Sequence, residues 1–433
     1  MLADSRPRVA YVRGSYLNPF EAQYLEPLLD RFHITAVYPR SHRFDVQSLR
    51  VPRVELPCLD YANGLIPRYI GGHGVPNLLR PWGYDEFLFG LKDALAGVDL
   101  VHAAEQTFYC TYQVARLKRQ HGYQLIVLQD EINPFWAEGR GDTLERAAFV
   151  RESADLFIAR SERARSALIG EGVAPERVRV IGHGVDVRRF CPGPRSTPLC
   201  QRFGIEPDHV VILFAGRLVW EKGLYNLADA AALLLRDESF RKLKPLFVLA
   251  GDGPERGALA RRLRQLGVSD FFRLIGPHPY ALVPELHRLA DIFVLPSIAT
   301  RTVQEQFGMV LIEAMATGKP VLATRCGAID EVVGPAGLLV QANDCHRLAE
   351  GLHTLISRRD LREQYGEQAL ARVWRLFSHE AISTEIAAAY AAVLAKAQAP
   401  APAPAQALPE LSPATTLSRA ALIYVRDNSH AAQ

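Results

Sequence analysis

Two glutamates, Glu305 and Glu313, stand eight positions apart in the stretch EQFGMVLIEAMATGKPV. Every one of the eight residues that start at Met309 is apolar except Glu313, and Gly318 followed by Pro320 predicts that this helix ends before the glycine. A helix this apolar must be nearly surrounded by protein, and a buried carboxylate is costly unless it is paired or hydrogen-bonded. Glu313 is therefore either satisfied internally, by an arginine or backbone amides, or turned toward a ligand.

A ligand at the start of this helix would be an anion, typically phosphate, because free N–H groups and the helix dipole favour negative charge there. Gly308, which has no Cβ, would let that anion come close. Glu313 could accept both hydroxyls of a ribose, and Glu305 could accept hydroxyls of a group beyond the phosphate. Eight helical residues span about 12 Å, roughly the length of ribose, diphosphate and a hexose in line. The spacing indicates a nucleoside diphosphate sugar, and we place Phe307 and Met309 in the same binding site.

Arg217 and Lys222 follow the apolar run VVILFAG, which is where a parallel sheet places ligand-binding groups. Cations beside a diphosphate would stabilise the charge that develops as the sugar–oxygen bond breaks. In isolation, GRLVWEKG would be interpreted as a solvated loop. Beside the two glutamates, we favour a role in binding the diphosphate.

The stretch GDGPERG, which starts at Gly251, imitates a dinucleotide-binding loop. Its last glycine does not fit the GxGxxG spacing, and no acidic partner follows at the usual distance. We interpret it as a tight strand–helix turn near the nucleotide, with Gly253 bordering the base pocket.

Short apolar, β-branched runs alternate with helical patterns along the chain, and the series restarts after Pro192. Such runs predict strands buried on both faces, joined by helices. We expect an α/β protein with two doubly wound, Rossmann-like parallel-sheet domains that face each other across a cleft. The predicted parts are an acceptor-side domain over 1–190, a donor-binding domain over 204–376, a helix at about 379–397 that packs back on the first domain, and a Pro/Ala-rich linker and tail over 398–433.

Composition is that of an ordinary globular protein: 433 residues, 48% hydrophobic, 22% charged and a net charge of +3. This balance argues against nucleic acid as the main partner. No apolar run approaches the ~20 residues of a membrane span, and the first residues lack the apolar core of a secretion signal. The six cysteines form no CxxC, and HExxH is absent. We expect a cytoplasmic location.

The stretch from Glu305 to Glu313 resembles the paired-glutamate motif of retaining glycosyltransferases with the GT-B fold, family 4 in particular, although Gln306 stands where the usual form has glycine. Four further segments resemble family segments in the same order: VIGHGVDVRRFCPG, LFAGRLVWEKGLYNLADAAALL, LAGDGPERGALARRL and ADIFVLPS. The resemblance implies a retaining hexosyltransferase that uses a UDP- or GDP-sugar and a hydroxyl acceptor, a glycan, lipid or small metabolite, in polysaccharide or glycoconjugate biosynthesis. It implies that Glu305 holds the sugar, Glu313 the ribose, and Arg217 with Lys222 the diphosphate.

Metal-dependent transferases of the GT-A fold usually carry a DxD motif, and the chain contains none. Positive side chains and backbone dipoles can take the metal's place on the diphosphate. We therefore expect no required metal and no other cofactor.

The acceptor half has weaker signals. Gly14 directly follows the first predicted strand, where the resemblance implies a glycine-containing loop near the acceptor and the donor phosphate, although most such glycines only make turns. In DLVHAAEQ, His102 matches the first histidine of the family's His-x-His, but Ala104 replaces the second. We predict Glu105 as a catalytic residue in the cleft, and we interpret His102 as a core histidine. Other polar residues follow predicted strands and are cleft residues or else caps and salt-bridge partners: Glu131, Asn133, Arg160 and Ser161.

Two alternatives are a sugar-nucleotide epimerase of this fold and a non-catalytic nucleotide-sugar-binding protein. The first-domain glycine loop and the paired-glutamate motif favour transfer over the epimerase, and the intact arginine, lysine and two glutamates argue against a non-catalytic protein. The base, the donor sugar, the acceptor and the oligomeric state have no signature in the sequence. A lipid acceptor would imply peripheral membrane contact through a basic or apolar face. The mildly basic stretch 38–53 is one candidate for that face, and a solvated loop is the alternative.

Overall fold

A computed structural model of the chain describes residues 5–40, 44, 46–58, 87–137, 142–300 and 303–398. The Pro/Ala-rich tail that follows residue 398 lies outside the described residues, as does part of the basic stretch 38–53. No helix within the described ranges is both long and apolar enough to cross a membrane.

The first domain is built on a parallel sheet with the strand order β3-β2-β1-β4-β5-β6-β7. Its strands are β1 (Arg8–Val12), β2 (His33–Pro39), β3 (Arg53–Leu56), β4 (Leu100–Ala104), β5 (Gln124–Gln129), β6 (Leu156–Ala159) and β7 (Val178–Val180). The order reverses between β1 and β4, which pair in register from Val9 with Leu100 to Val12 with Ala103. Ligands of such sheets bind beyond the carboxyl ends of the strands at this switch point.

The second domain repeats the plan with the order β10-β9-β8-β11-β12-β13. Its strands are β8 (Val210–Ala215), β9 (Pro245–Ala250), β10 (Phe272–Gly276), β11 (Ile292–Leu295), β12 (Val321–Arg325) and β13 (Leu338–Gln341). Here the order reverses between β8 and β11, so the segments that follow these two strands lie side by side.

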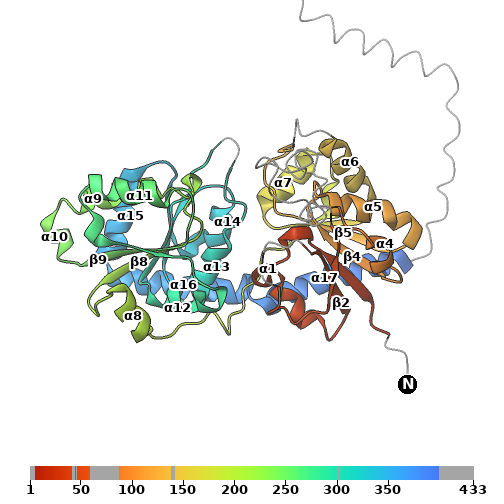
Figure 1. Ribbon diagram of the computed structural model, residues 1–433, viewed down its shortest axis with the longest axis horizontal. Helices are drawn as coiled ribbons and strands as arrows, with labels where there is room; N and C mark the ends of the chain where they lie inside the picture. The colour runs from red at the N-terminus through yellow and green to blue at the C-terminus, as the bar shows by residue number, and fades with distance from the viewer. Residues whose placement is uncertain are drawn as a thin grey trace, which may run out of the picture. The chain divides into compact units, whose positions relative to one another are not determined.

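Helices cover both sheets (Figure 1). Those of the first domain are α1 (Pro19–Ala22), α4 (Leu91–Ala94), α5 (Tyr109–His121), α6 (Thr143–Ser153) and α7 (Glu162–Gly170). Those of the second are α8 (Thr197–Phe203), α9 (Leu224–Leu234), α10 (Glu238–Arg241), α11 (Arg256–Gln265), α12 (Val283–Leu289), α13 (Met309–Ala316), α14 (Ile329–Val333), α15 (Cys345–Ser357) and α16 (Arg359–Leu376). The second domain has one continuous apolar core, whereas the first sheet separates two cores, one on each face.

The chain crosses between the domains twice, and the two crossings lie side by side. The backbone N–H of Val185 donates to the carbonyl of Phe377 at 2.8 Å, and the N–H of His379 donates to the carbonyl of Val185 at 3.1 Å. The second crossing leads into α17 (His379–Gln398), whose buried Ile386 and Tyr390 belong to a first-domain core. The last described helix therefore returns to the first sheet.

The apolar runs in the sequence correctly predicted every described strand except β3. That strand reads RVEL, and only its last residue is buried. A short, half-exposed edge strand leaves no continuous apolar run, because only strands buried on both faces have one.

Candidate active site

A cavity of about 780 Å³ lies where the strand ends of the two domains meet. Residues that follow β1, β4 and β5 line it from the first domain, and residues that follow β8 and β11 line it from the second. Both groups stand at the switch points of their sheets, which is where doubly wound folds bind ligands. Seven of the residues predicted as site residues line this cavity: Glu105, Arg217, Lys222, Glu305, Phe307, Gly308 and Met309.

Lys222 and Glu305 form a close ion pair on the second-domain side. Nζ of Lys222 lies 2.6 Å from Oε2 of Glu305, and the two side chains are 20% and 13% exposed. The hydroxyl of Ser297 donates to the same carboxylate oxygen at 2.9 Å. Both donors contact Oε2, so they fix the carboxylate in place. Among the described residues, none contacts Oε1 of Glu305, which can still accept a hydrogen bond from a ligand.

Two glycines allow the backbone to bring this pair together. A Cβ on Gly223, beside Lys222, would lie 1.9 Å from the carbonyl oxygen of Pro296, and one on Gly327 would lie 1.9 Å from the carbonyl oxygen of Glu305. No side chain can occupy those positions without moving the backbone. The carbonyl of Glu305 also accepts a hydrogen bond of 2.8 Å from the N–H of Ala328. These close backbone contacts therefore fix the backbone positions from which the side chains of Lys222 and Glu305 extend into the cavity.

The N-terminus of α13 also opens on the cavity. The predicted start at Met309 is confirmed, and Gly308 is the N-cap, with a φ of +85° and no side-chain cap. Gly308 and Met309 both line the cavity. The first N–H groups of α13 are thus without a capping side chain at the place where the sequence predicted an anion.

Arg217 lines the cavity from the loop after β8, and its side chain is 75% exposed. Its nearest acidic partner is Glu221, at 3.9 Å. Gly253, by contrast, does not line this cavity. A Cβ there would lie 2.3 Å from the carbonyl oxygen of Leu218, so this glycine lets the turn after β9 pack on the neighbouring loop.

Glu313 lies one turn inside α13 and is buried, away from the cavity that holds Glu305. The hydroxyl of Tyr280 donates to Oε1 of Glu313 at 3.0 Å, and Nε2 of His287 lies 3.5 Å from Oε2. Burial and the neighbouring Glu313 charge raise the pKa of Tyr280 well above its usual value, so the phenol stays a donor. In this structure the carboxylate is satisfied internally, which is the alternative that the sequence left open.

Arg13 and Asp130 dominate the first-domain side. Nη2 of Arg13, directly after β1, lies 2.7 Å from Glu21 and 2.9 Å from Asp130, and Nε2 of His183 lies 2.7 Å from the other oxygen of Asp130. Burial alone would raise the pKa of Asp130, but His183 and Arg13 hold it below its ordinary range. Asp130 is therefore a fixed anion that orients the other two side chains.

Glu105 completes this group at the end of β4. It is 7% exposed and has a φ of +55°, a left-handed conformation that is uncommon for a side chain of this size. Its Oε1 accepts a hydrogen bond of 2.6 Å from the N–H of Asp130. Burial, followed by the charge of Asp130, raises its pKa from 4.5 to about 8, which favours the protonated form of this carboxyl group.

Gln306 joins the two domains across the cavity. Its Nε2 donates to Oε2 of Glu131 at 3.0 Å, and Oε1 of Glu131 accepts from the backbone and side chain of Asn133 at 2.8 and 2.9 Å. Gln306 stands where the family motif usually has glycine. A glycine could not make this interdomain contact, because the contact comes from the side chain of Gln306.

The remaining candidates have structural positions. His102 is fully buried, its Nδ1 lies 2.8 Å from the hydroxyl of Tyr390, and burial lowers its pKa well below the usual value. Ser161 caps α7 by accepting from the N–H of Ala164. Arg160 donates to the carbonyls of Ile181 and Gly182. Gly14 begins a short 3₁₀ turn with a φ of +59°, and it is the adjacent Arg13 that reaches the cavity.

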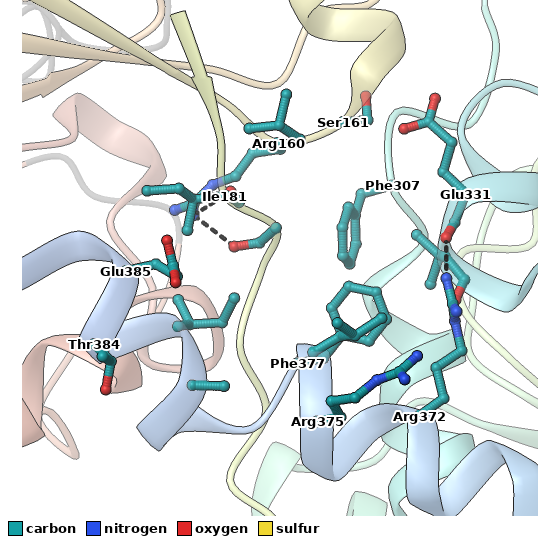
Figure 2. Close-up of a pocket in the computed structure, with 16 residues that line it drawn as sticks. Arg160, Ser161, Ile181, Phe307, Glu331, Arg372, Arg375, Phe377, Thr384 and Glu385 are labelled. Atoms are coloured by element: carbon teal, nitrogen blue, oxygen red, sulfur yellow. Dashed lines mark hydrogen bonds between the residues drawn. The ribbon is translucent and has the colours of Figure 1, made fainter. Parts of the chain in front are cut away.

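A second cavity, of about 480 Å³, lies beside the chain crossings (Figure 2). Phe307 lines both cavities, and its ring packs against Phe377 with centroids 5.8 Å apart. Figure 2 also shows the carboxylate of Glu331 directed toward the start of α7, where it accepts from the N–H groups of Glu162 and Arg163 at 2.5 and 3.1 Å. Phe307 thus forms part of the wall between the larger cavity and the crossing region.

Sequence reasoning missed three cavity residues that form one network: Arg13, Asp130 and His183. Each of the three directly follows or lies close to a predicted strand, and that position is the feature of the sequence that could have indicated a place in the cavity. A single polar residue after a strand is more often a cap, and the network appears only when three strand ends come together.

The two halves of the chain match two family models. Residues 38–189 match the model described as Glycosyltransferase Family 4, and residues 199–372 match the model described as Glycosyl transferases group 1. A D-inositol 3-phosphate glycosyltransferase of Streptomyces bingchenggensis is 34% identical over 341 residues, which are 72% of each chain. The chain belongs to glycosyltransferase family 4. It spans about half the length of the first curated relatives it matches, such as D-inositol 3-phosphate glycosyltransferase 2 of Catenulispora acidiphila, with 34% identity over 52% of this chain and 53% of that one.

Solved structures of other proteins share the fold of this family 4 member. Anabaena Alr3699/HepE, crystallised in complex with UDP, superposes with a TM-score of 0.71 and 21% identity, over 89% of this chain and 100% of that one. Sucrose-phosphate synthase from Thermosynechococcus elongatus gives a TM-score of 0.68 with 20% identity, over 90% of this chain and 100% of that one. The two-domain architecture is the GT-B fold.

Proposed function

We propose that this family 4 member transfers a hexosyl unit from a nucleoside diphosphate sugar, UDP- or GDP-linked, to a hydroxyl acceptor, with retention of the anomeric configuration. The observation that carries the proposal is the Lys222–Glu305 pair beside the N-terminus of α13 in the cavity. One carboxylate, one ammonium group and a helix N-terminus in one cavity match the hydroxyls and the diphosphate of such a donor.

The proposed roles follow the chemistry of each group. Glu305 would accept hydrogen bonds from the sugar hydroxyls, and Lys222, Arg217 and the first N–H groups of α13 would stabilise the negative charge on the departing diphosphate. These groups supply positive charge by themselves, so we propose that no metal ion is required. Glu313 would bind the ribose once the Tyr280 hydroxyl has moved away from it.

In the proposed reaction, the bond between the anomeric carbon and the acceptor oxygen forms on the face from which the diphosphate leaves. The bond from the anomeric carbon to the phosphate oxygen breaks, and the acceptor proton passes to the leaving phosphate. The relatives named D-inositol 3-phosphate glycosyltransferases and the UDP complex of Alr3699/HepE support a nucleotide-sugar donor and a small acceptor as the first classes to test.

A two-stage experiment tests this proposal. A thermal-shift screen with UDP, GDP, ADP and their sugars identifies the donor, because a ligand that binds the native state raises its stability. The selected sugar nucleotide is then incubated with the protein, without and with acceptors, and NMR follows the anomeric signal. Release of nucleoside diphosphate with an α-to-α or β-to-β product supports the proposal. A new sugar-nucleotide isomer formed from the donor alone would instead identify an epimerase, and binding without turnover a non-catalytic protein.

A further inference from the structure

A fully buried histidine lies next to the carboxylate of Glu313. His287 belongs to α12, and its Nε2 atom lies 3.5 Å from Oε2 of Glu313. Tyr280 contacts the other oxygen of this carboxylate, Oε1, at 3.0 Å. The two oxygens are therefore held differently, because the Tyr280 contact is a formed hydrogen bond and the His287 contact is longer than the usual range of about 2.7–3.2 Å.

Both ring nitrogens of His287 lack a hydrogen-bond partner within the described parts of the chain. The ring lies among aromatic side chains, with its centroid 6.0 Å from that of Phe190 and 5.3 Å from that of Phe293. A neutral imidazole still carries one N–H, and a buried donor without a partner is costly and rare in folded proteins. An apolar ring would suit these aromatic neighbours better, so the imidazole needs another explanation.

The carboxylate of Glu313 is close enough to pair with His287 after a small movement. A carboxylate only accepts hydrogen bonds, so its place beside Nε2 favours the tautomer with the proton on that nitrogen. A shift of about half an ångström would bring Oε2 and Nε2 within hydrogen-bond distance. The hydrogen bond from Tyr280 holds Oε1, so the carboxylate can settle against His287 once that hydroxyl leaves.

We propose that His287 is a positioning residue of the donor site: when the donor ribose replaces the Tyr280 hydroxyl, Nε2–H of His287 donates to Oε2 of Glu313 and fixes the carboxylate for the ribose hydroxyls. The inference rests on the proposed function and adds the residue that determines how strictly the site requires ribose. Each carboxylate oxygen has two lone pairs, so Oε2 can accept from His287 and still accept from one hydroxyl.

The test compares ribose with deoxyribose nucleotides and needs no turnover. Titration calorimetry measures the affinity of the full chain for UDP, 2′-deoxy-UDP and 3′-deoxy-UDP, or for the guanosine set if GDP is the nucleotide that binds. The wild-type protein should bind the ribonucleotide at least about tenfold more tightly than either deoxy form, because each deoxy form loses one hydrogen bond to a charged group.

His287→Phe keeps an aromatic ring and removes both nitrogens. It should reduce the preference for ribose to about threefold or less, because a carboxylate that is no longer held in place loses part of its binding energy to ordering. His287→Gln places an amide N–H near the position of Nε2 and should restore most of the preference.

His102→Phe is the matched control for removing a buried histidine. His102 is also fully buried, but its Nδ1 lies 2.8 Å from the hydroxyl of Tyr390 in the first domain. The control should lower stability and leave the preference for ribose unchanged.

A measurement on the wild-type chain covers the case in which His287→Phe does not fold. With isotope-labelled histidine, NMR should show the Nε2–H proton signal of His287 moving downfield when UDP or GDP binds, as expected for a new hydrogen bond to a carboxylate. Comparison with His287→Gln assigns the signal.

Two results would overturn the inference: an unchanged preference for ribose in a folded His287→Phe, or a His287 signal that nucleotide binding leaves in place. A wild-type protein that binds ribose and deoxyribose nucleotides equally would show that Glu313 does not bind the ribose, and His287 would lose the role proposed here. If no nucleoside diphosphate or sugar nucleotide binds at all, the proposed function itself is contradicted, and the inference about His287 falls with it.

Discussion

The hydroxyl of Tyr280 donates a hydrogen bond of 3.0 Å to Oε1 of Glu313, and the same hydroxyl accepts one of 3.2 Å from Nε2 of Gln23 in the first domain. The guanidinium of Arg189 lies over the Tyr280 ring, 4.3 Å from its centre, in a cation–π contact. The Tyr280 hydroxyl thus links the two domains. It also hydrogen-bonds to the Glu313 carboxylate, which we propose as the acceptor for the ribose hydroxyls of the donor. Donor binding and the Gln23 contact should therefore be linked.

Tyr280→Phe should bind the donor about fivefold more tightly, because the ribose no longer has to displace a hydrogen bond worth about 1 kcal/mol. Titration calorimetry with the selected sugar nucleotide measures this. Tyr123→Phe, which removes a buried hydroxyl that donates to the carbonyl of Val114 in the first domain, is the control and should leave the affinity unchanged. Weaker donor binding in Tyr280→Phe would mean that the hydroxyl contacts the donor directly.

Lys222→Ala should lower the turnover number for transfer by about 10²–10³-fold, the usual effect of removing one group that stabilises transition-state charge. Steady-state kinetics measures the loss, and circular dichroism confirms that the fold persists. Lys118→Ala provides a close control, because Lys118 and Asp155 form an ion pair at the same 2.6 Å with similar exposure, 21% and 29%. Equal activity in the two variants would exclude Lys222 from the reaction.

The sequence predicted the two-domain architecture and the second-domain side of the cavity, but not the contacts of Glu313 or the first-domain network. Strands buried on both faces are continuous apolar runs, so β8 and β11 could be located, and with them the segments that carry Lys222 and Glu305. The state of Glu313 could not be predicted, because it depends on a tyrosine 33 residues away. Likewise, Arg13 and Asp130 are 117 residues apart, and no local pattern connects them.

Glu105→Gln should change the pH dependence of stability. The folded-state pKa of Glu105, about 8, lies above its ordinary value of 4.5, so the native state binds a proton that the unfolded chain has lost. The contribution of Glu105 is complete below about pH 4.5 and is lost as pH rises toward 8, by up to about 1.4 kcal/mol per pH unit.

Denaturant unfolding at several pH values checks this expectation. The wild-type free energy of unfolding should fall relative to that of Glu105→Gln, which cannot titrate, between about pH 4.5 and 8, with a constant difference above. Asp130 does not disturb the comparison, because its lowered pKa moves its own titration below that window. Parallel curves for the two proteins across the window would show that Glu105 is ionised in the native state.

Gly327→Ala should displace Glu305 without touching its side chain. A Cβ at residue 327 would lie 1.9 Å from the carbonyl oxygen of Glu305, a contact that only a backbone shift can relieve.

Gly267→Ala is the matched control, because both glycines have positive φ, +57° and +72°, but nothing lies within 4 Å of a Cβ at residue 267. The control should lose about 1 kcal/mol of stability through backbone strain alone. Gly327→Ala should lose more than about 3 kcal/mol, in the range of substitutions that disrupt packing, and transfer activity should fall even at temperatures where the variant is folded. Equal stability and activity in the two variants would mean that the position of Glu305 does not depend on this close contact.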